Sequence, residues 1–231
     1  MSYGLKIETE VTLDLDTPWS YEREFYTNVK GTILHYPLVA DDERDGDGLD
    51  DDELNGLPVG QIEARRFRWG AVVDDDLDPL DCAAATDQNL FEATECAYGI
   101  LAQERGKAGA IWEGCGDLIY IEHLWLEDEH RGNNVGMLVM QRFLEEANAA
   151  VAILEPRPHV AEDNQLNERE LATAVRKLAG YWKRFGFTPC PPPYEKFVWL
   201  DLTLKRPPLR ATEESKELIG LNVDLTHMIE K

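Results

Sequence analysis

One stretch, residues 117–148, constrains the fold of this 231-residue chain more than any other. An apolar, strand-like run at residues 118–126 leads into a short turn at residues 131–136, and an amphipathic helix follows at once. Small residues in such a turn leave backbone N–H groups uncovered, and the helix start adds unpaired N–H groups and the positive end of its dipole. The segment therefore predicts an anion site suited to a pyrophosphate. It is neither a Rossmann glycine pattern nor a P-loop, which needs Gly-Lys-Ser/Thr.

The turn resembles the acyl-CoA binding motif of the GNAT superfamily of N-acyltransferases. In that motif an Arg or Gln is followed by two residues, a Gly, one residue, and a Gly or Ala. Arg131 and Gly136 match its ends, Gly132 is a common extra, and Asn134 stands where the middle Gly is usual. Asn tolerates positive φ better than most other residues, so we expect the turn to form.

Further matches follow in the expected order along the chain. Residues 181–187 (YWKRFGF) resemble the family's aromatic pair and Gly-Phe, residues 57–62 its third strand, and residues 196–204 its closing strand. The resemblance covers about residues 30–205. It implies an α/β (α+β) fold of the GNAT type, with a central, mostly antiparallel mixed sheet and helices on both faces. Two strands are expected to splay near residues 124–126 and 151–154.

Periodicity predicts the remaining elements. The expected strands are residues 5–15, 32–40, 58–69, 118–126, 151–154 and 196–204, and the expected helices are residues 18–28, 86–104, 135–148 and 168–185, with a loop at 72–85. Asn167 and Glu170 predict a capping box, and Gly186 a helix stop. Leu171, Val175, Leu178, Trp182 and Phe185 predict a buried stripe on that last helix.

The domain organisation expected from these elements is simple. Residues 1–208 form one GNAT-like domain with an acidic loop at 41–53 and a helical insertion at 72–112, and residues 209–231 form a polar extension. Cys82, Cys96, Cys115 and Cys190 lack C-x-x-C spacing and are expected to be isolated thiols. With no membrane-length apolar run and no signal peptide at the N-terminus, we expect a cytoplasmic protein that does not enter the membrane.

The net charge of −22 is unevenly spread. Residues 41–53 hold nine acids and one Arg, and residues 74–81 hold five acids. Such a charge argues against nucleic-acid binding and permits a cationic substrate, although solvated acidic loops give the same pattern. Residues 45–54 partly follow EF-hand spacing, but Leu54 stands where the bidentate Glu belongs, so no metal site is predicted.

The strand before the turn carries the candidate base. Strict alternation would place Tyr120, Glu122, Leu124 and Leu126 on one face, and Ile119, Ile121, His123 and Trp125 on the other. An amine that arrives as ammonium must lose a proton before it attacks a thioester. The resemblance implies a base on the Tyr120 face, which makes Glu122 the candidate, with His123 a weaker one. The alternative is that Glu122 is a structural carboxylate paired with an Arg. His130, in the turn, touches phosphate or faces solvent.

The candidate acid is less well defined. In many members of the family, a Tyr four residues before the Gly of the Gly-Phe pair protonates the leaving thiolate. That register holds Trp182, and Tyr181 lies one residue away, roughly 100° around the helix. Either Tyr181 serves as the acid, or the thiolate is protonated otherwise, or catalysis is lost. Trp182 is expected to pack in the core and to line the acyl site.

The resemblance implies acetyl transfer from acetyl-CoA to a primary amine of a small molecule or peptide, by direct attack and without a metal. The implied catalytic residues are Glu122 and Tyr181. The implied cofactor-binding residues are Leu124, Trp125, Leu126, Arg131, Gly132, Asn133, Asn134, Val135, Gly136 and Trp182. Two other hypotheses stay open, an acyl-CoA sensor without turnover and an acidic protein-interaction module. A homodimer is also compatible with the sequence.

Overall fold

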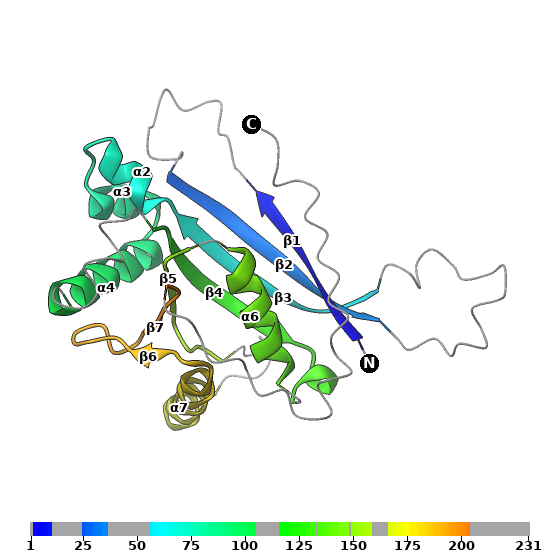
Figure 1. Cartoon of the computed structure of the whole chain (residues 1–231). Coiled ribbons are helices and arrows are strands. Elements are labelled where there is room, and N and C mark those ends of the chain that lie inside the picture. Colours follow the sequence, from blue (N-terminus) through cyan, green and yellow to red (C-terminus); the bar gives the residue numbers. More distant parts are fainter. Residues whose placement is uncertain are drawn as a thin grey trace, which may run out of the picture.

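The computed structural model describes residues 2–10, 25–36, 56–104, 116–132, 134–147, 149–158 and 166–203, with the backbone alone at 2–10, 36 and 101–104. Its strands form one seven-stranded sheet in the order β1-β2-β3-β4-β5-β7-β6 (Figure 1). They are β1 (Ser2–Glu10), β2 (Tyr26–Tyr36), β3 (Leu57–Phe67), β4 (Leu118–Leu126), β5 (Val151–Leu154), β6 (Thr188–Pro189) and β7 (Val198–Asp201). All neighbouring pairs are antiparallel except β4 and β5. The expected central, mostly antiparallel mixed sheet is confirmed.

Helices cover both faces of the sheet. They are α2 (Trp69–Asp74), α3 (Pro79–Thr86), α4 (Gln88–Glu104), the 3-10 helix η3 (Asp128–His130), α6 (Val135–Glu146) and α7 (Glu168–Phe185). One buried cluster joins α6 and the end of α7 to the sheet, and a second joins α2, α3 and α4 to the other face (Figure 1). No helix in the described parts of the chain combines the length and apolarity that a membrane span requires.

The insertion between β3 and β4 is more helical than expected. Residues 72–85 were predicted to be loop, but they hold the end of α2 and most of α3. The local signal was present, because Asp78 accepts a hydrogen bond from the Leu80 N–H and Pro79 occupies the first helical position. The helix expected at 18–28 is also wrong at its end, since Tyr26 begins β2. Residues 41–53 and 209–231 lie outside the described residues.

Helix α7 begins and ends as expected. Asn167 and Glu170 form the capping box, and Gly186 ends the helix with a φ of 118°. The buried stripe is shorter than predicted, because Trp182 and Phe185 are buried but Leu171 is 42 % exposed. The first turns of α7 therefore stand away from the core.

A β-bulge in β4 overturns the expected alternation of its side chains. Glu63 pairs with His123 and Ala64 with Ile121, so Glu122 is the extra residue of the bulge. Ile121 before the bulge and Leu126 after it belong to the same buried cluster beneath α6. One inserted residue moves all later side chains to the opposite face. Glu122 therefore does not share a face with Leu124 and Leu126, which corrects the prediction.

Candidate functional site

The site lies where β4 and β5 part. Their parallel pairing ends at Ile121 and Leu154, whereas β4 continues to Leu126. Beyond this point no described strand pairs with the β5 side of β4, and the chain enters η3 and the start of α6. The expected splay near residues 124–126 and 151–154 holds only in part, because residues 151–154 are fully paired with residues 118–121 and the two strands part only beyond them.

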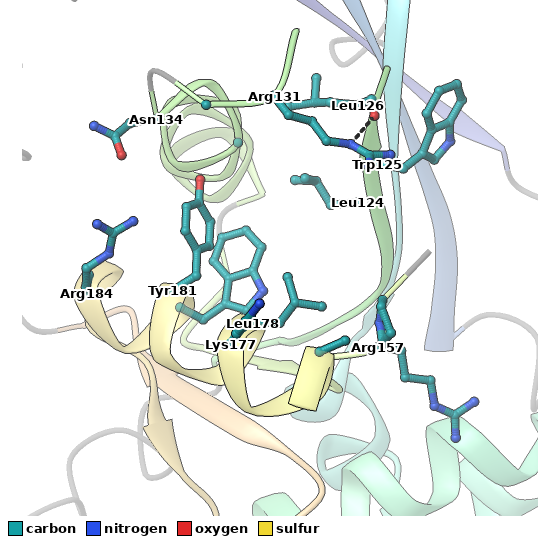
Figure 2. A pocket seen from close by; sticks show the side chains of 15 residues that line it. Leu124, Trp125, Leu126, Arg131, Asn134, Arg157, Lys177, Leu178, Tyr181 and Arg184 are labelled. Carbon is teal, nitrogen blue, oxygen red and sulfur yellow. Dashed lines mark hydrogen bonds between the residues drawn. The ribbon is translucent and has the colours of Figure 1, made fainter. Parts of the chain in front are cut away.

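A cavity of about 470 Å³ opens beside this parting, between β4, the start of α6 and α7 (Figure 2). Its lining residues are Leu124, Trp125, Leu126, Arg131, Gly132, Asn134, Gly136, Arg157, Pro158, Ala174, Lys177, Leu178, Tyr181, Trp182 and Arg184. The incompletely buried first turns of α7 face this space through Ala174 and Leu178. The cavity thus combines an apolar strip from β4 and α7 with a helix start.

The turn into α6 has the backbone that its sequence suggested. Asn134 is the residue before the helix and adopts the left-handed conformation, with φ 59° and ψ 19°. Gly132 also has a positive φ, 96°, and nothing lies within 4 Å of the position of an added Cβ. The Val135 N–H donates to the Gly132 carbonyl at 3.2 Å, and the Val135 side chain is buried. Asn133 lies outside the described residues.

Arg131 braces the turn against β4. Its Nε donates to the Leu126 carbonyl at 2.8 Å, and its Nη1 lies 2.6 Å from an Asp128 carboxylate oxygen. The Leu126 carbonyl therefore already accepts a hydrogen bond within the chain. Figure 2 places the Trp125 indole on the other side of β4 from the cavity, so its backbone contributes to the lining.

Tyr181 reaches across the cavity from α7 to the start of α6. A Cβ built on Gly136 would lie 3.0 Å from the Tyr181 hydroxyl oxygen. Burial raises the pKa of Tyr181, while a hydrogen bond from the Met137 backbone and the nearby Arg184 act in the opposite direction. The phenol hydroxyl thus lies at the turn. Trp182 is 6 % exposed and packs edge-on against Tyr181, Phe185 and Phe187, which supports the predicted core role.

Every charged residue that lines the cavity is basic. They are Arg131, Arg157, Lys177 and Arg184. Arg157 pairs with Glu155 at 2.7 Å, whereas Lys177 and Arg184 have no acidic partner in the described part of the chain. Arg184 lies over the Tyr181 ring, 5.2 Å from its centroid. In a chain with a net charge of −22, a cavity lined by these four basic residues, two of them without an acidic partner among the described residues, favours a polyanionic ligand.

Glu122 does not line the cavity and lies on the α4 side of the sheet. The Arg65 guanidinium is 2.8 Å from its carboxylate, and the Glu122 side chain is 27 % exposed. Burial raises the pKa of Glu122, Arg65 lowers it, and Glu63 raises it. Both sequence interpretations of this residue stay compatible with the geometry, because a carboxylate paired with an Arg can also accept a proton.

The cavity brings together most of the predicted binding residues and adds others. The exceptions are the buried Val135 side chain and the undescribed Asn133. Sequence reasoning missed Arg157, Lys177 and Arg184. Helical spacing from Tyr181 could have found Lys177 and Arg184, since residues three and four apart share a helix face. Glu127, Glu129 and His130 bring ligand atoms within 4.8 Å of one another near the turn, but the two carboxylates are exposed, as solvated acidic groups commonly are.

No family model and no curated protein sequence matches the chain. Solved structures with a similar fold include the KacTA–DNA complex, at 8 % identity and a TM-score of 0.35 over 78 % of this chain and 70 % of that one. Drosophila melanogaster polyamine N-acetyltransferase is similar at 12 % identity and a TM-score of 0.32, over 75 % and 74 % of the two chains. The NatC complex bound to Gag peptide and CoA is similar at 11 % identity and a TM-score of 0.31, over 85 % of this chain and 99 % of that one. These likenesses are distant and do not identify the reaction of this chain.

Proposed function

We propose that this protein transfers an acyl group, most simply acetyl, from acyl-CoA to a primary amine. The observation that carries the proposal is the cavity itself, which joins a helix start, an apolar strip and four basic side chains at the parting of β4 and β5. A helix start and basic groups suit a pyrophosphate, and the apolar strip along Leu124 and Leu126 suits the pantetheine arm. The thioester would then lie near the end of the β4–β5 pairing.

Glu122 is our candidate general base for this reaction. The amine nitrogen attacks the thioester carbonyl carbon, the C–S bond breaks, and CoA leaves as a thiolate that takes up a proton. The proton lost by the amine passes to the Glu122 carboxylate, directly or through water. Catalysis otherwise depends on holding the amine and the thioester in attack geometry. The acidic composition of the chain favours a cationic amine as acceptor.

Gly136→Asp tests the cofactor site. The new carboxylate would meet the Tyr181 hydroxyl and repel the pyrophosphate, so we expect calorimetry to detect no binding of acetyl-CoA. Gly180→Asp is the matched control, because an added Cβ there meets nothing within 4 Å. Unchanged affinity in a folded Gly136→Asp variant would place the acyl-CoA elsewhere.

Glu122→Gln tests the base. The amide keeps the shape of the side chain but cannot accept the proton, so the acetylation rate should fall by roughly 10²-fold or more with acetyl-CoA affinity little changed. The assay is mass spectrometry of a panel of mono-, di- and polyamines and short peptides. A variant with the parental pH–rate profile would rule out Glu122.

An acyl-CoA sensor without turnover is the second candidate. It is favoured by Trp182, which is buried at the register where the resembling family has its acidic Tyr. Binding of acetyl-CoA with no acetylated product across the amine panel would favour the sensor.

A further inference from the structure

We infer that Arg65 is a positioning residue for Glu122, and that Asp87 ties this arginine to the helical insertion between β3 and β4. The inference rests on the proposed role of Glu122 as base. By this inference the insertion contributes to the reaction, because it helps to position Glu122 from the side of the sheet opposite to the cavity.

Arg65 lies on β3 and bridges two carboxylates. One arm, Nη2, is 2.8 Å from Oε1 of Glu122, and the other arm, Nη1, pairs with Oδ2 of Asp87. The three side chains are 22 %, 27 % and 28 % exposed, so the bridge is partly shielded from water. A guanidinium is a rigid fork of donors, and a fork that holds two partners fixes both of their positions.

Asp87 is itself fixed, because its other oxygen begins α4. Oδ1 of Asp87 accepts hydrogen bonds from the N–H groups of Asn89 at 2.6 Å and Leu90 at 3.0 Å. The helix behind this cap is anchored in the second buried cluster, where Leu90 and Ala93 are fully buried. If Arg65 moved away from Glu122, it would also lose its pair with the Asp87 carboxylate, which the start of α4 holds in place.

The bulge in β4 explains why Glu122 needs such support. As the extra residue of the bulge it has no partner across the β3–β4 ladder. A bulge re-aims its side chain and weakens local pairing. The orientation of the Glu122 carboxylate thus depends on side-chain contacts, and among the described residues the ion pair with Arg65 lies at contact distance.

Other charged groups among the described residues lie around Glu122, and substitutions can separate their effects. Glu63 on β3 repels it, and Tyr120 on β4 interacts with Glu122, Arg65, Glu155 and Arg157. Asp87 faces it from the start of α4, through Arg65. Arg66, the next residue on β3, instead pairs with Asp117 at 2.6 Å. Arg66 therefore supplies a control with the same charge on the same strand.

The test is a ¹³C NMR titration of the Glu122 carboxyl in the full chain, assigned by its loss in Glu122→Gln. Arg65→Gln should raise the pKa of Glu122 by about one unit or more, because a contacting positive charge is removed. Asp87→Asn keeps the oxygen that caps α4 but removes a negative charge that shares Arg65, so the pKa should fall by roughly half a unit. Arg65→Lys should restore most of the parental pKa, and Arg66→Gln should leave it unchanged.

The inference would be overturned if the Glu122 pKa in Arg65→Gln and in Asp87→Asn both equalled the parental value, since a merely structural Arg65 moves neither. If Arg65→Gln does not fold, Asp87→Asn decides alone. In each variant, the apparent pKa on the acid limb of the pH–rate profile of acetylation should shift in the same direction as the Glu122 pKa measured by NMR. If the expected pKa shifts occur but no amine is acetylated, the positioning role of Arg65 stands and the proposed function is refuted. If amines are acetylated but the Glu122 pKa does not respond to these variants, the proposed function stands and the positioning role of Arg65 is refuted.

Discussion

At the scale of single residues, the turn before α6 depends on Asn134. Its left-handed backbone is the conformation that most side chains avoid and that Gly adopts freely. The amide side chain makes no capping hydrogen bond to the helix. Asn134 is therefore present for its backbone tolerance, and the turn keeps its shape without the Gly that the resembling motif usually has.

Asn134→Ala should destabilise the protein by about 1 kcal/mol, because alanine has the Cβ that opposes a left-handed backbone without the local polar compensation of Asn. Asn134→Gly should leave the free energy of unfolding unchanged or slightly higher. Urea denaturation of the three proteins measures the difference. Equal losses in the Ala and Gly variants would mean that the amide group itself is needed.

At the scale of elements, α7 has two different halves. Its last turn carries Trp182 and Phe185 into the core, and its earlier turns present Ala174, Lys177 and Leu178 to the cavity. Tyr181 lies between these regions, and its hydroxyl points toward the start of α6 (Figure 2). The helix thus joins the core to the binding site, and substitutions along it should separate stability from activity.

Trp182→Phe should cost about 1–3 kcal/mol of stability, because a large buried ring is replaced by a smaller one.

Trp182→Tyr should accelerate turnover in an enzyme that lacks a proton donor and leave a sensor inactive. Tyr181→Phe should slow turnover by less than about tenfold, or 1.4 kcal/mol of barrier, because the Tyr181 hydroxyl lies at the turn. A larger fall with intact acyl-CoA affinity would identify Tyr181 as the acid.

At the scale of the whole molecule, the charges are segregated. The chain is strongly acidic, yet the charged residues that line the cavity are basic. They come from the turn directly after η3, from the segment after β5 and from α7. Ion pairs also join distant parts of the chain. Lys196, before β7, pairs with Glu92 on α4, which links the insertion to the last strand of the fold.

Glu92→Gln should therefore lower stability in a pH-dependent way. Hydrogen bonds from Lys196 and Gln88 lower the pKa of Glu92 below its usual value. A lowered carboxyl pKa contributes stability above the unfolded value, about 4.3, and the contribution is lost as pH falls through the folded value. We expect a difference of about 0.2–1 kcal/mol near pH 7, since both side chains are partly exposed, and a smaller one toward pH 4.

Chemical denaturation across this pH range measures the effect. Glu95→Gln, on the same helix, is the control, because no ion pair joins Glu95 to another described residue. A deficit in Glu92→Gln that is constant with pH would mean that the pair with Lys196 contributes nothing through its charge.

The sequence by itself determined the features that depend on neighbouring residues. The strand, turn and helix around residues 131–136, the left-handed Asn134, and the caps of α7 follow from local backbone preferences and helical periodicity. The tertiary structure decided the rest, for a physical reason. A bulge arises from pairing with another strand, so β4 alone could not reveal that Glu122 and Leu124 face opposite sides. Likewise, only folding brings Arg65 and Asp87 to Glu122, and Arg157 and Lys177 to the turn, because contacts between distant residues leave no periodic signal along the chain.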